Sequence, residues 1–297
     1  MKVLISGVEH FGNELAESLQ RNDSKNKYLY LNIKTNIYKR LYFYFHLLTS
    51  DVLFVIYVDK YNMKSVDMAL RLRKKVFLSW IGTDVLNALP RIRKGLFNTN
   101  YLDHTIHTTN STWLQEELQE VGIKADYLTI FCYKNKERKI NFPTQFSVLL
   151  YVPKGKEEFY GMNVFIKLAK ELPQIQFKVV GISKYPNIPI NIKLLGWVDM
   201  DKEYENTTVY IRYPQHDGEA HSVLEALSYG KIVFYNKNYP HVNYVKKYDE
   251  LKNGLIQIYE QFQANELSIN YEGIKYVKMN YEEKKVHQKY LNLFIAT

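Results

Sequence analysis

The chain has 297 residues, which at about 150 residues per domain predicts two domains, each large enough to bury a core. Apolar residues make up 46% and charged residues 24%, close to the globular average, so a disordered tail, a collagen and a coiled coil are not expected. The single cysteine, Cys132, excludes an intramolecular disulfide and a multi-cysteine zinc site and favours a reducing compartment.

Positive charge is concentrated in the first half of the chain. Residues 1–150 hold 21 Lys and Arg against 14 Asp and Glu, whereas residues 151–297 hold 19 against 17. Two basic clusters, Arg71 to Lys75 and Arg91 to Lys94, carry much of the excess. Each alone is typical of a solvated helix face, but two together raise an anionic acceptor or a peripheral membrane contact through the N-terminal domain as a second interpretation. Nucleic acid is not favoured as a partner, since no known readout motif accompanies the charge.

The N-terminal sequence Met1 to Gly7 has too short an apolar run for a signal peptide. The most membrane-like window, Leu41 to Val58, is interrupted by polar residues from His46 to Asp51. We interpret this window as a buried helix end, a turn and a strand. A cytoplasmic protein, with peripheral membrane association left open, is the expectation.

Short runs rich in Val, Ile, Leu, Tyr and Phe alternate with longer amphipathic stretches, a pattern typical of β-α-β units with a parallel sheet. In the first half we expect strands at Lys2 to Ser6, Tyr28 to Asn32, Asp51 to Val58, Lys75 to Trp80 and His104 to Thr108. Helices are expected between them at Phe11 to Gln20, Lys64 to Arg73 and Ser111 to Val121.

The polar stretch Lys134 to Lys139, followed by Pro143, is the best linker candidate. Beyond it we expect strands at Phe146 to Val152, Gln176 to Val180, Ile192 to Val198, Thr208 to Tyr213 and Ile232 to Tyr235. Helices are expected at Met162 to Leu172, Glu219 to Tyr229 and Tyr271 to Phe294. The pattern predicts an α/β protein with Rossmann-like domains at 1–140 and 144–275, a C-terminal helix at 276–297 that packs back toward the first, and a cleft between the domains.

The turn after the first strand contains Gly7 and Gly12, but it matches neither the dinucleotide fingerprint nor a P-loop. Gly12 at a helix start would offer free backbone N–H groups to a phosphate. A glycine that is needed only for a tight turn is an equally good interpretation.

The most informative segment is Tyr210 to Gly230, in which a buried strand leads through a polar loop into a helix. Asp217 lies before the helix start and Glu225 about two turns along the helix. At about 1.5 Å of rise per residue, the two are on the order of 12 Å apart. Helix N–H groups from Glu219 to Ser222 would hold a pyrophosphate, and the two carboxylates would accept hydrogen bonds from sugar and ribose hydroxyls. Taken alone, each carboxylate reads as structural, Asp217 as an N-cap and Glu225 as a solvated helix residue.

These residues carry a family resemblance. Asp217 to Leu227 together with Gly230 resembles the E-x7-E region of retaining GT-B glycosyltransferases of the group 1, family 4-like class. Trp80 to Asp84 is similar to the family's aromatic-x-Gly-Ser/Thr-Asp stretch, and Thr109 to Ile123 resembles its Leu-rich helix that ends in Gly-Ile. Leu150 to Val152 and Leu195 to Val198 are similar to strands of the family's C-terminal domain, so the likeness spans most of the chain.

The resemblance implies a GT-B fold and transfer of a sugar, with retention, from a nucleotide diphosphate sugar to an acceptor held by the N-terminal domain. It implies that Glu225 bonds the ribose, that Asp217 contacts the sugar, and that Lys154 acts with them in catalysis. The donor would be held mostly by the C-terminal domain. The predicted donor-binding residues are Gly12, Lys154, Tyr160, Gly161, Arg212, His216, Gly218, Glu219, Ala220, His221 and Glu225.

Three departures from the family pattern concern the donor. Asp217 replaces the motif's first glutamate and is one methylene shorter. Pro153-Lys154 replaces Gly-Arg, which puts a point charge in place of a bidentate phosphate fork. Tyr160-Gly161 stands where a Lys-Gly pair is usual, so that lysine is absent or is supplied by Lys156, and Arg212 would add positive charge back.

No metal and no cofactor besides the nucleotide sugar are predicted. Asp199-Met200-Asp201 matches the Asp-x-Asp metal signature of the other large glycosyltransferase fold, but its place before a helical stretch favours a capping role. The eight histidines show no zinc-binding spacing.

Two alternatives to transfer stay open. A non-catalytic nucleotide-sugar-binding protein on the same scaffold would explain the altered phosphate contacts, and a nucleotide-sugar epimerase shares the fold. The sequence does not determine the nucleotide base, the donor sugar or the acceptor, which is a glycan, a lipid or a protein. It also does not determine the catalytic general base or the oligomeric state.

Overall fold

The computed structural model describes residues 1–33, 37–59, 63–98 and 100–296. The chain divides into two compact units. Unit 1 comprises Met1–Lys134, the short segment His216–Glu219 and the stretch from Tyr281 to the C-terminus, and unit 2 comprises Asn135–Gln215 and Ala220–Asn280. The chain therefore leaves unit 2 for four residues in its second half and then re-enters it.

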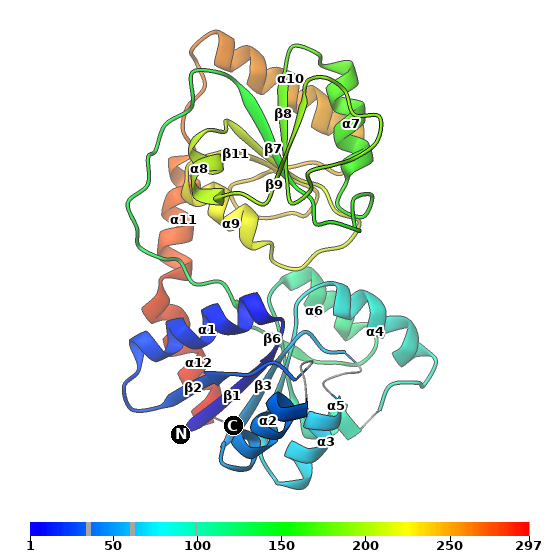
Figure 1. The fold of residues 1–297 in the computed structure, drawn as a ribbon, viewed down its shortest axis with the longest axis vertical. Coiled ribbons are helices and arrows are strands. Elements are labelled where there is room, and N and C mark those ends of the chain that lie inside the picture. The colour runs from blue at the N-terminus through cyan, green and yellow to red at the C-terminus, as the bar shows by residue number, and fades with distance from the viewer. Residues whose placement is uncertain (34–36, 60–62, 99, 297) are drawn as a thin grey trace. The chain divides into compact units, whose positions relative to one another are not determined.

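Unit 1 is built on a parallel sheet with the order β2-β1-β3-β4-β5-β6 (Figure 1). Its strands are β1 (Lys2–Gly7), β2 (Lys27–Tyr30), β3 (Val52–Ile56), β4 (Lys75–Trp80), β5 (Ile106–Thr109) and β6 (Ala125–Tyr127). Its helices are α1 (Glu9–Asn22), α2 (Ile37–Leu48), α3 (Met63–Arg71), α4 (Thr83–Arg93), α5 (Asn100–His104), α6 (Thr112–Gln119) and α12 (Glu283–Ala296).

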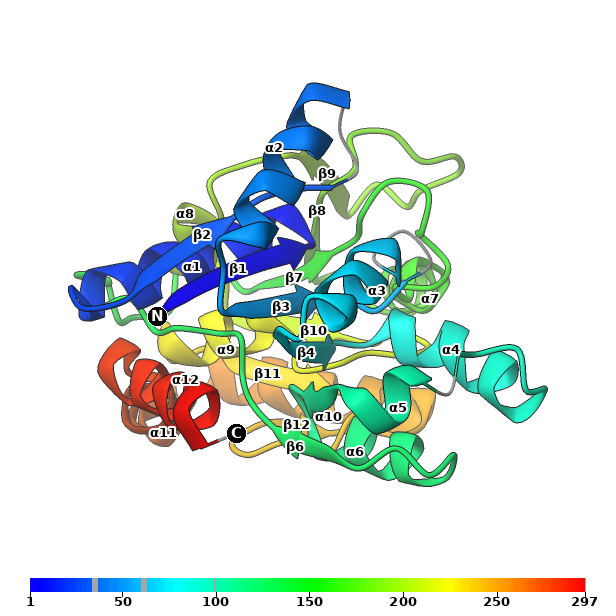
Figure 2. The ribbon, with the colours of Figure 1, turned by 90° about the horizontal axis from the view of Figure 1, so that it is seen from below.

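Both faces of this sheet are covered, which explains why its central strands read as continuous apolar runs. Side chains that alternate along each strand enter two separate cores. Leu53 and Val55 of β3 pack with the side of the sheet that carries α2 to α6, whereas Val52 and Phe54 pack with α1 and α12. Figure 2 shows α2 and α3 on the same face of the sheet.

Unit 2 has a second parallel sheet, with the order β12-β11-β10-β7-β8-β9. Its strands are β7 (Ser147–Tyr151), β8 (Gln176–Val180), β9 (Ile192–Gly196), β10 (Val209–Arg212), β11 (Ile232–Tyr235) and β12 (Asn243–Tyr244). Its helices are α7 (Met162–Glu171), α8 (Met200–Glu205), α9 (His221–Ser228), α10 (Tyr248–Gln263) and α11 (Tyr271–Tyr281), the last ending on a residue of unit 1.

The strand orders fix where each sheet can bind a ligand. Read from β9, the sheet of unit 2 runs 3-2-1-4-5-6 within the unit, which is the Rossmann order with its switch point between β7 and β10. The sheet of unit 1 runs 2-1-3-4-5-6, with its switch point between β1 and β3. Ligands of open α/β sheets bind outside the carboxyl ends of the strands at such points.

The predicted α/β class with two Rossmann-like sheets is confirmed. The expected helix at Tyr271 to Phe294 is instead two helices, α11 and α12, which meet at Glu282. The window from Leu41 to Val58 does contain a helix end, a turn and a strand, but much of that helix end is exposed rather than buried. Across the described residues, no helix combines the length and the apolar character needed to cross a membrane.

The packing of α12 against the sheet gives a test of unit 1. Phe294 is 1% exposed and its ring lies 5.2 Å from that of Phe77 and 6.0 Å from that of Phe54. We expect Phe294→Ala to lower the free energy of unfolding by about 3–5 kcal/mol, because it removes a ring from a closed core. The neighbouring Ile295 is 66% exposed, so Ile295→Ala should change the free energy of unfolding by less than about 0.5 kcal/mol. Equal effects of the two variants in urea unfolding would contradict this placement of α12.

Candidate functional site

In unit 2, polar groups collect at the switch point between β7 and β10. Arg212 is the last residue of β10 and is only 6% exposed. Its guanidinium lies 4.6 Å from the ring centroid of Tyr160, which follows β7 and precedes α7. A cation held against an aromatic face is oriented without losing its charge. The two predicted residues Arg212 and Tyr160 are therefore brought together within one unit.

The turn into α7 depends on a glycine. Gly161 is the N-cap of α7 and has φ of +85°, a left-handed conformation that favours glycine. A Cβ at this position would lie 2.7 Å from the backbone oxygen of Tyr213, which follows Arg212. Gly161 thus lets the loop after β7 approach the loop after β10. Lys154 lies earlier in the same loop and is exposed, as is Lys156.

Glu225 is held in place by a buried tyrosine. It lies in α9 and is half-buried, and its Oε2 accepts a hydrogen bond of 3.0 Å from the hydroxyl of Tyr204 in α8. Burial, followed by the charge of Glu225, raises the pKa of Tyr204 well above its ordinary value, so the hydroxyl stays a donor. The interpretation of Glu225 as a merely solvated helix residue is therefore wrong.

The start of α9 differs from the expectation. The helix begins at His221 rather than at Glu219, and Ala220 is its N-cap. The backbone oxygen of Ala220 accepts from the N–H groups of Val223 and Leu224. Helical N–H groups for an anion therefore begin at His221 and Ser222, and those of Glu219 and Ala220 lie outside the helix.

The segment His216–Glu219 is packed tightly within unit 1. Gly82, with φ of +144°, lies in the turn between β4 and α4, and a Cβ there would be 3.0 Å from the backbone nitrogen of Gly218. A Cβ on Gly218 would in turn overlap the backbone oxygen of Ile81. Trp113 adds a hydrogen bond of 2.7 Å from its Nε1 to the backbone oxygen of Asp217. The two glycines are required by this close approach of two backbones.

Glu219 has a structural role that the sequence did not reveal. Its side chain is 5% exposed, and the hydroxyls of Tyr127 (2.8 Å), Tyr281 (2.6 Å) and Thr129 donate to its carboxylate. A buried carboxylate needs such donors, because an unpaired one is costly. The prediction that Glu219 contacts the donor is thus corrected for its side chain, because the carboxylate already accepts hydrogen bonds from hydroxyls of unit 1.

His216 is 8% exposed and bonds a carboxylate of unit 1. Its Nε2 lies 2.8 Å from Oε2 of Glu117, which makes Nε2 the protonated nitrogen. Within the described part of the chain, its buried Nδ1 has no hydrogen-bond partner.

Asp217 is half-buried and belongs to unit 1, whereas Glu225 belongs to unit 2. The interpretation of Asp217 as a helix N-cap is wrong, because Ala220 occupies that position. The two members of the predicted acidic pair are therefore held by different frameworks.

The phosphate role predicted for Gly12 is corrected. Gly12 is the fourth residue of α1, and its N–H already donates to the backbone oxygen of Val8 at 2.9 Å. A Cβ at Gly12 would overlap the ring of Tyr30. Neither a free amide nor a tight turn explains this glycine; the close packing of a tyrosine ring does. The turn itself falls at Gly7, with φ of +116°.

The Asp-x-Asp sequence is a helix cap, as predicted. The side chain of Asp199 accepts from the backbone N–H of Asp201 at the start of α8. Asp201 pairs with Lys136 and accepts a 2.8 Å hydrogen bond from the hydroxyl of Tyr229. Among the residues that the structure describes, no three His, Cys, Asp or Glu side chains form a cluster that could hold a metal ion.

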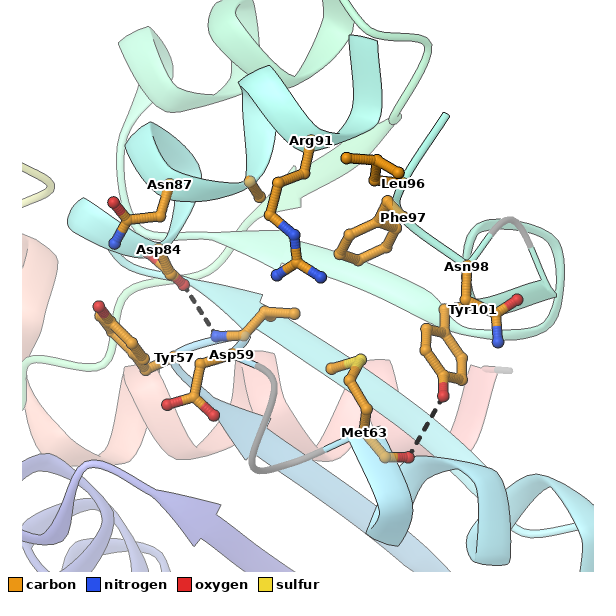
Figure 3. A pocket seen from close by; sticks show the side chains of 12 residues that line it. Tyr57, Asp59, Met63, Asp84, Asn87, Arg91, Leu96, Phe97, Asn98 and Tyr101 are labelled. Atoms are coloured by element: carbon orange, nitrogen blue, oxygen red, sulfur yellow. Dashed lines mark hydrogen bonds between the residues drawn. The ribbon is translucent and has the colours of Figure 1, made fainter. Parts of the chain in front are cut away.

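Unit 1 contains a pocket that sequence reasoning missed (Figure 3). It has a volume of about 410 Å³ and lies beside the carboxyl ends of β3 and β4. Its lining is Tyr57, Val58, Asp59, Met63, Asp84, Asn87, Ala88, Arg91, Leu96, Phe97, Asn98 and Tyr101. Figure 3 shows Arg91 pointing into the pocket from α4. The pocket thus combines apolar walls with one cationic side chain, Arg91, and two acidic ones, the half-buried Asp59 and the buried Asp84.

Asp84 lines this pocket and holds two of the turns around it by hydrogen bonds. It is 1% exposed and accepts from the backbone N–H groups of Val58 (3.0 Å), Ile81 (3.1 Å) and Gly82 (2.8 Å). Burial raises the pKa of Asp84 to about 6, although these hydrogen bonds act in the opposite direction. The carboxyl group therefore ties the turn after β3 to the turn after β4, which explains its place in the Trp80 to Asp84 motif.

A scan against protein-family models and a search of curated proteins both return no match. Solved structures do match. A sucrose-phosphate synthase from Thermosynechococcus elongatus superposes with a TM-score of 0.68 at 13% identity over 100% of both chains. A mutant of S. aureus TarM in complex with Fondaparinux, alpha-GlcNAc-glycerol and UDP gives 0.64 at 12% identity, covering 82% of this chain and 55% of TarM. UDP-GlcNAc 2-epimerase from Neisseria meningitidis bound to UDP-GlcNAc gives 0.55 at 12% identity over 100% of both chains.

These likenesses establish the fold, which is that of the GT-B glycosyltransferases. This chain spans about half the length of TarM. The same holds for the pneumococcal O-GlcNAc transferase GtfA, of which 56% is covered at a TM-score of 0.59.

The packing role of Gly12 can be tested directly. Alanine is the better helix former by about 1 kcal/mol, yet we expect Gly12→Ala to destabilise the protein by about 1–3 kcal/mol, because its methyl group meets the Tyr30 ring. Asn13→Ala, on the exposed side of the same helix, is the control and should be nearly neutral. A stable Gly12→Ala protein that has lost nucleotide binding would restore the phosphate role.

The network at Glu219 gives a second test. In Glu219→Gln an amide NH₂ group faces hydroxyls that now donate to the carboxylate. We expect a loss of about 2–3 kcal/mol in the free energy of unfolding, from a charge-assisted network left partly unsatisfied. The exposed Glu272 serves as control, and Glu272→Gln should show no such loss in thermal and urea unfolding. Unchanged stability of Glu219→Gln would rule out the network as an anchor.

Proposed function

We propose that this protein is a glycosyltransferase that moves a sugar from a nucleoside diphosphate sugar to an acceptor, with retention and without a metal. The observation that carries the proposal is the arrangement in unit 2 of Arg212 against Tyr160 at the switch point of a Rossmann-ordered sheet. The oriented Glu225 in α9 adds a hydroxyl acceptor. The GT-B fold supports the same assignment.

The donor diphosphate is assigned to the positive groups of unit 2. Arg212 supplies a buried charge, Lys154 an exposed one, and His221 and Ser222 the first N–H groups of α9. Glu225 would accept from the ribose hydroxyls, with Tyr204 holding its orientation. Uridine is the first base to test, because TarM and GtfA were solved with UDP and the epimerase with UDP-GlcNAc.

The chemistry proposed is electrostatic. As the bond from the sugar to the diphosphate breaks, negative charge grows on the leaving group, and Arg212, Lys154 and the α9 N–H groups would stabilise it. Asp217 would accept a hydrogen bond from a hydroxyl of the donor sugar. No side chain is assigned as general base.

We assign the acceptor to the pocket of unit 1. Its volume of about 410 Å³ suits one small ring or a short chain segment. Asp59 would accept from an acceptor hydroxyl, and Phe97 and Tyr101 offer apolar faces of the kind on which sugar rings stack. Arg91 would favour an acceptor that carries negative charge.

The direct test offers the purified protein UDP-, GDP- and ADP-sugars and follows release of the nucleoside diphosphate, with and without a chelator. We expect turnover with one nucleotide, unchanged by the chelator, and a product with the donor's anomeric configuration by NMR. Binding of all donors without turnover, with or without candidate acceptors, would instead favour a non-catalytic binding protein.

Glu225 and its tyrosine give a graded prediction. We expect Glu225→Gln to weaken donor binding by about 10- to 100-fold, from loss of a charged hydrogen-bond acceptor. Tyr204→Phe should have a smaller effect in the same direction, because it removes the hydroxyl that contacts Glu225 and the backbone oxygen of Ser222 but leaves the carboxylate in place. Glu266→Gln, at an exposed site of unit 2, is the control and should bind normally in calorimetry. Normal binding by Glu225→Gln would remove Glu225 from the donor site.

An epimerase is the second candidate, since a UDP-GlcNAc 2-epimerase shares the fold. It would convert a nucleotide sugar to its epimer with no acceptor present. NMR of the sugar ring after incubation without acceptor separates the two activities, because a transferase leaves the ring configuration unchanged at every carbon other than the anomeric one.

A further inference from the structure

Helix α2 carries an apolar stripe on its exposed side. Tyr38 is 78% exposed, Leu41 62% and Phe45 61%, at the 3- and 4-residue spacing that places side chains on one helix face. Tyr42 and Leu48 extend the same stripe, at 52% and 50% exposure. Five large apolar or aromatic side chains on one helix face form a continuous surface rather than scattered single residues.

This stripe is not the face by which α2 packs on unit 1, because a second apolar face of the helix contacts the core. Phe43 and Leu47 are fully buried in the core on the side of the sheet that carries α2 to α6, and Tyr44 packs against the same cluster. The helix is therefore held to unit 1 by one face, and its other face is exposed.

The surroundings of the stripe are cationic. The sequence of α2 contains no Asp or Glu, and Lys39 and Arg40 are exposed in its first turn. At its other end, Nζ of Lys74 donates to the backbone oxygen of Leu48 at 3.1 Å, which brings the basic cluster Arg71 to Lys75 beside the helix end. Lys2 lies 2.9 Å from Nδ1 of His46, while Asp51, just beyond the helix, is engaged by the backbone N–H of Lys2.

We propose that α2 binds an anionic lipid surface, with the stripe Tyr38, Leu41, Tyr42, Phe45 and Leu48 inserted at the interface. A helix that is apolar on one face and bordered by Lys and Arg is the arrangement by which peripheral proteins lie in the plane of a bilayer. Tyrosine rings favour the headgroup level, and cations attract anionic headgroups. This inference does not rest on the proposed transfer activity.

A second copy of this chain is the less favourable occupant. In a two-fold contact the same patch meets itself, so Lys39, Arg40 and the cluster Arg71 to Lys75 of one copy would approach those of the other. The helix supplies no acidic side chain to offset that repulsion. An anionic lipid surface offers both the apolar phase and the opposite charge.

The test measures flotation of the full chain with vesicles of phosphatidylcholine alone and of phosphatidylcholine mixed with phosphatidylglycerol. We expect binding to the mixed vesicles, weakened by salt, and little binding to the neutral ones. The double variant Leu41→Glu with Phe45→Glu should lose about tenfold or more of this binding, since two apolar insertions are removed. Both positions are exposed, so the fold should survive, which a circular-dichroism melt would verify.

A matched control removes exposed apolar residues elsewhere. Ile190→Glu with Tyr271→Glu changes residues of unit 2 that are fully exposed and 65% exposed, and should bind vesicles like the original protein. As a reporter, Tyr42→Trp should show a blue-shifted emission on addition of mixed vesicles. Absence of vesicle binding overturns the proposal. So does equal loss in both double variants, or a concentration-dependent dimer in light scattering that the α2 variant abolishes while vesicle binding persists.

Discussion

The buried carboxylate of Glu219 anchors the segment His216–Glu219 to unit 1. It is paired with three hydroxyls of unit 1, and a charge in such a place is tolerated only while those donors stay in position. Together with the backbone approach at Gly82 and Gly218, it fixes the segment His216–Glu219 in unit 1. Glu225 is oriented by Tyr204 of unit 2 instead. The spacing of Asp217 and Glu225 along the chain therefore does not define one rigid site, because each carboxylate is held by a different unit.

The parallel sheets explain where the remaining chemistry gathers. Strands that are buried on both faces favour apolar side chains along most of their length, and a crossover topology brings every strand's carboxyl end to one edge. Arg212 closes β10 at that edge in unit 2, and Asp59 follows β3 at that edge in unit 1. Asp84 is a carboxyl group placed deeper in unit 1, where burial raises its pKa and backbone N–H groups donate to it.

Sequence periodicity predicted the fold well because strand burial and helix amphipathicity are local. The family resemblance, rather than periodicity, predicted Arg212 and Tyr160 as site residues, and the structure brings them together. The expected place of Gly12 at a helix start was wrong, since α1 begins earlier, at Glu9, and the Gly12 amide therefore already has a partner within the helix. The pocket of unit 1 and the network of Glu219 could not be predicted. Their members come from segments far apart in the chain, and only tertiary packing decides which side chains meet.

Helix α2 shows a further limit of sequence patterns. Its high apolar content predicted burial within the protein. An apolar side chain is stabilised by leaving water, but this preference does not determine whether it enters a protein core or another apolar environment. With Phe43 and Leu47 already filling the core side, the remaining apolar side chains have no room in unit 1. The excess of basic over acidic residues in the first half of the chain then gains a physical meaning. Charge that surrounds an outward apolar stripe selects an anionic, apolar phase, whereas the same charge on a polar helix would only solvate it.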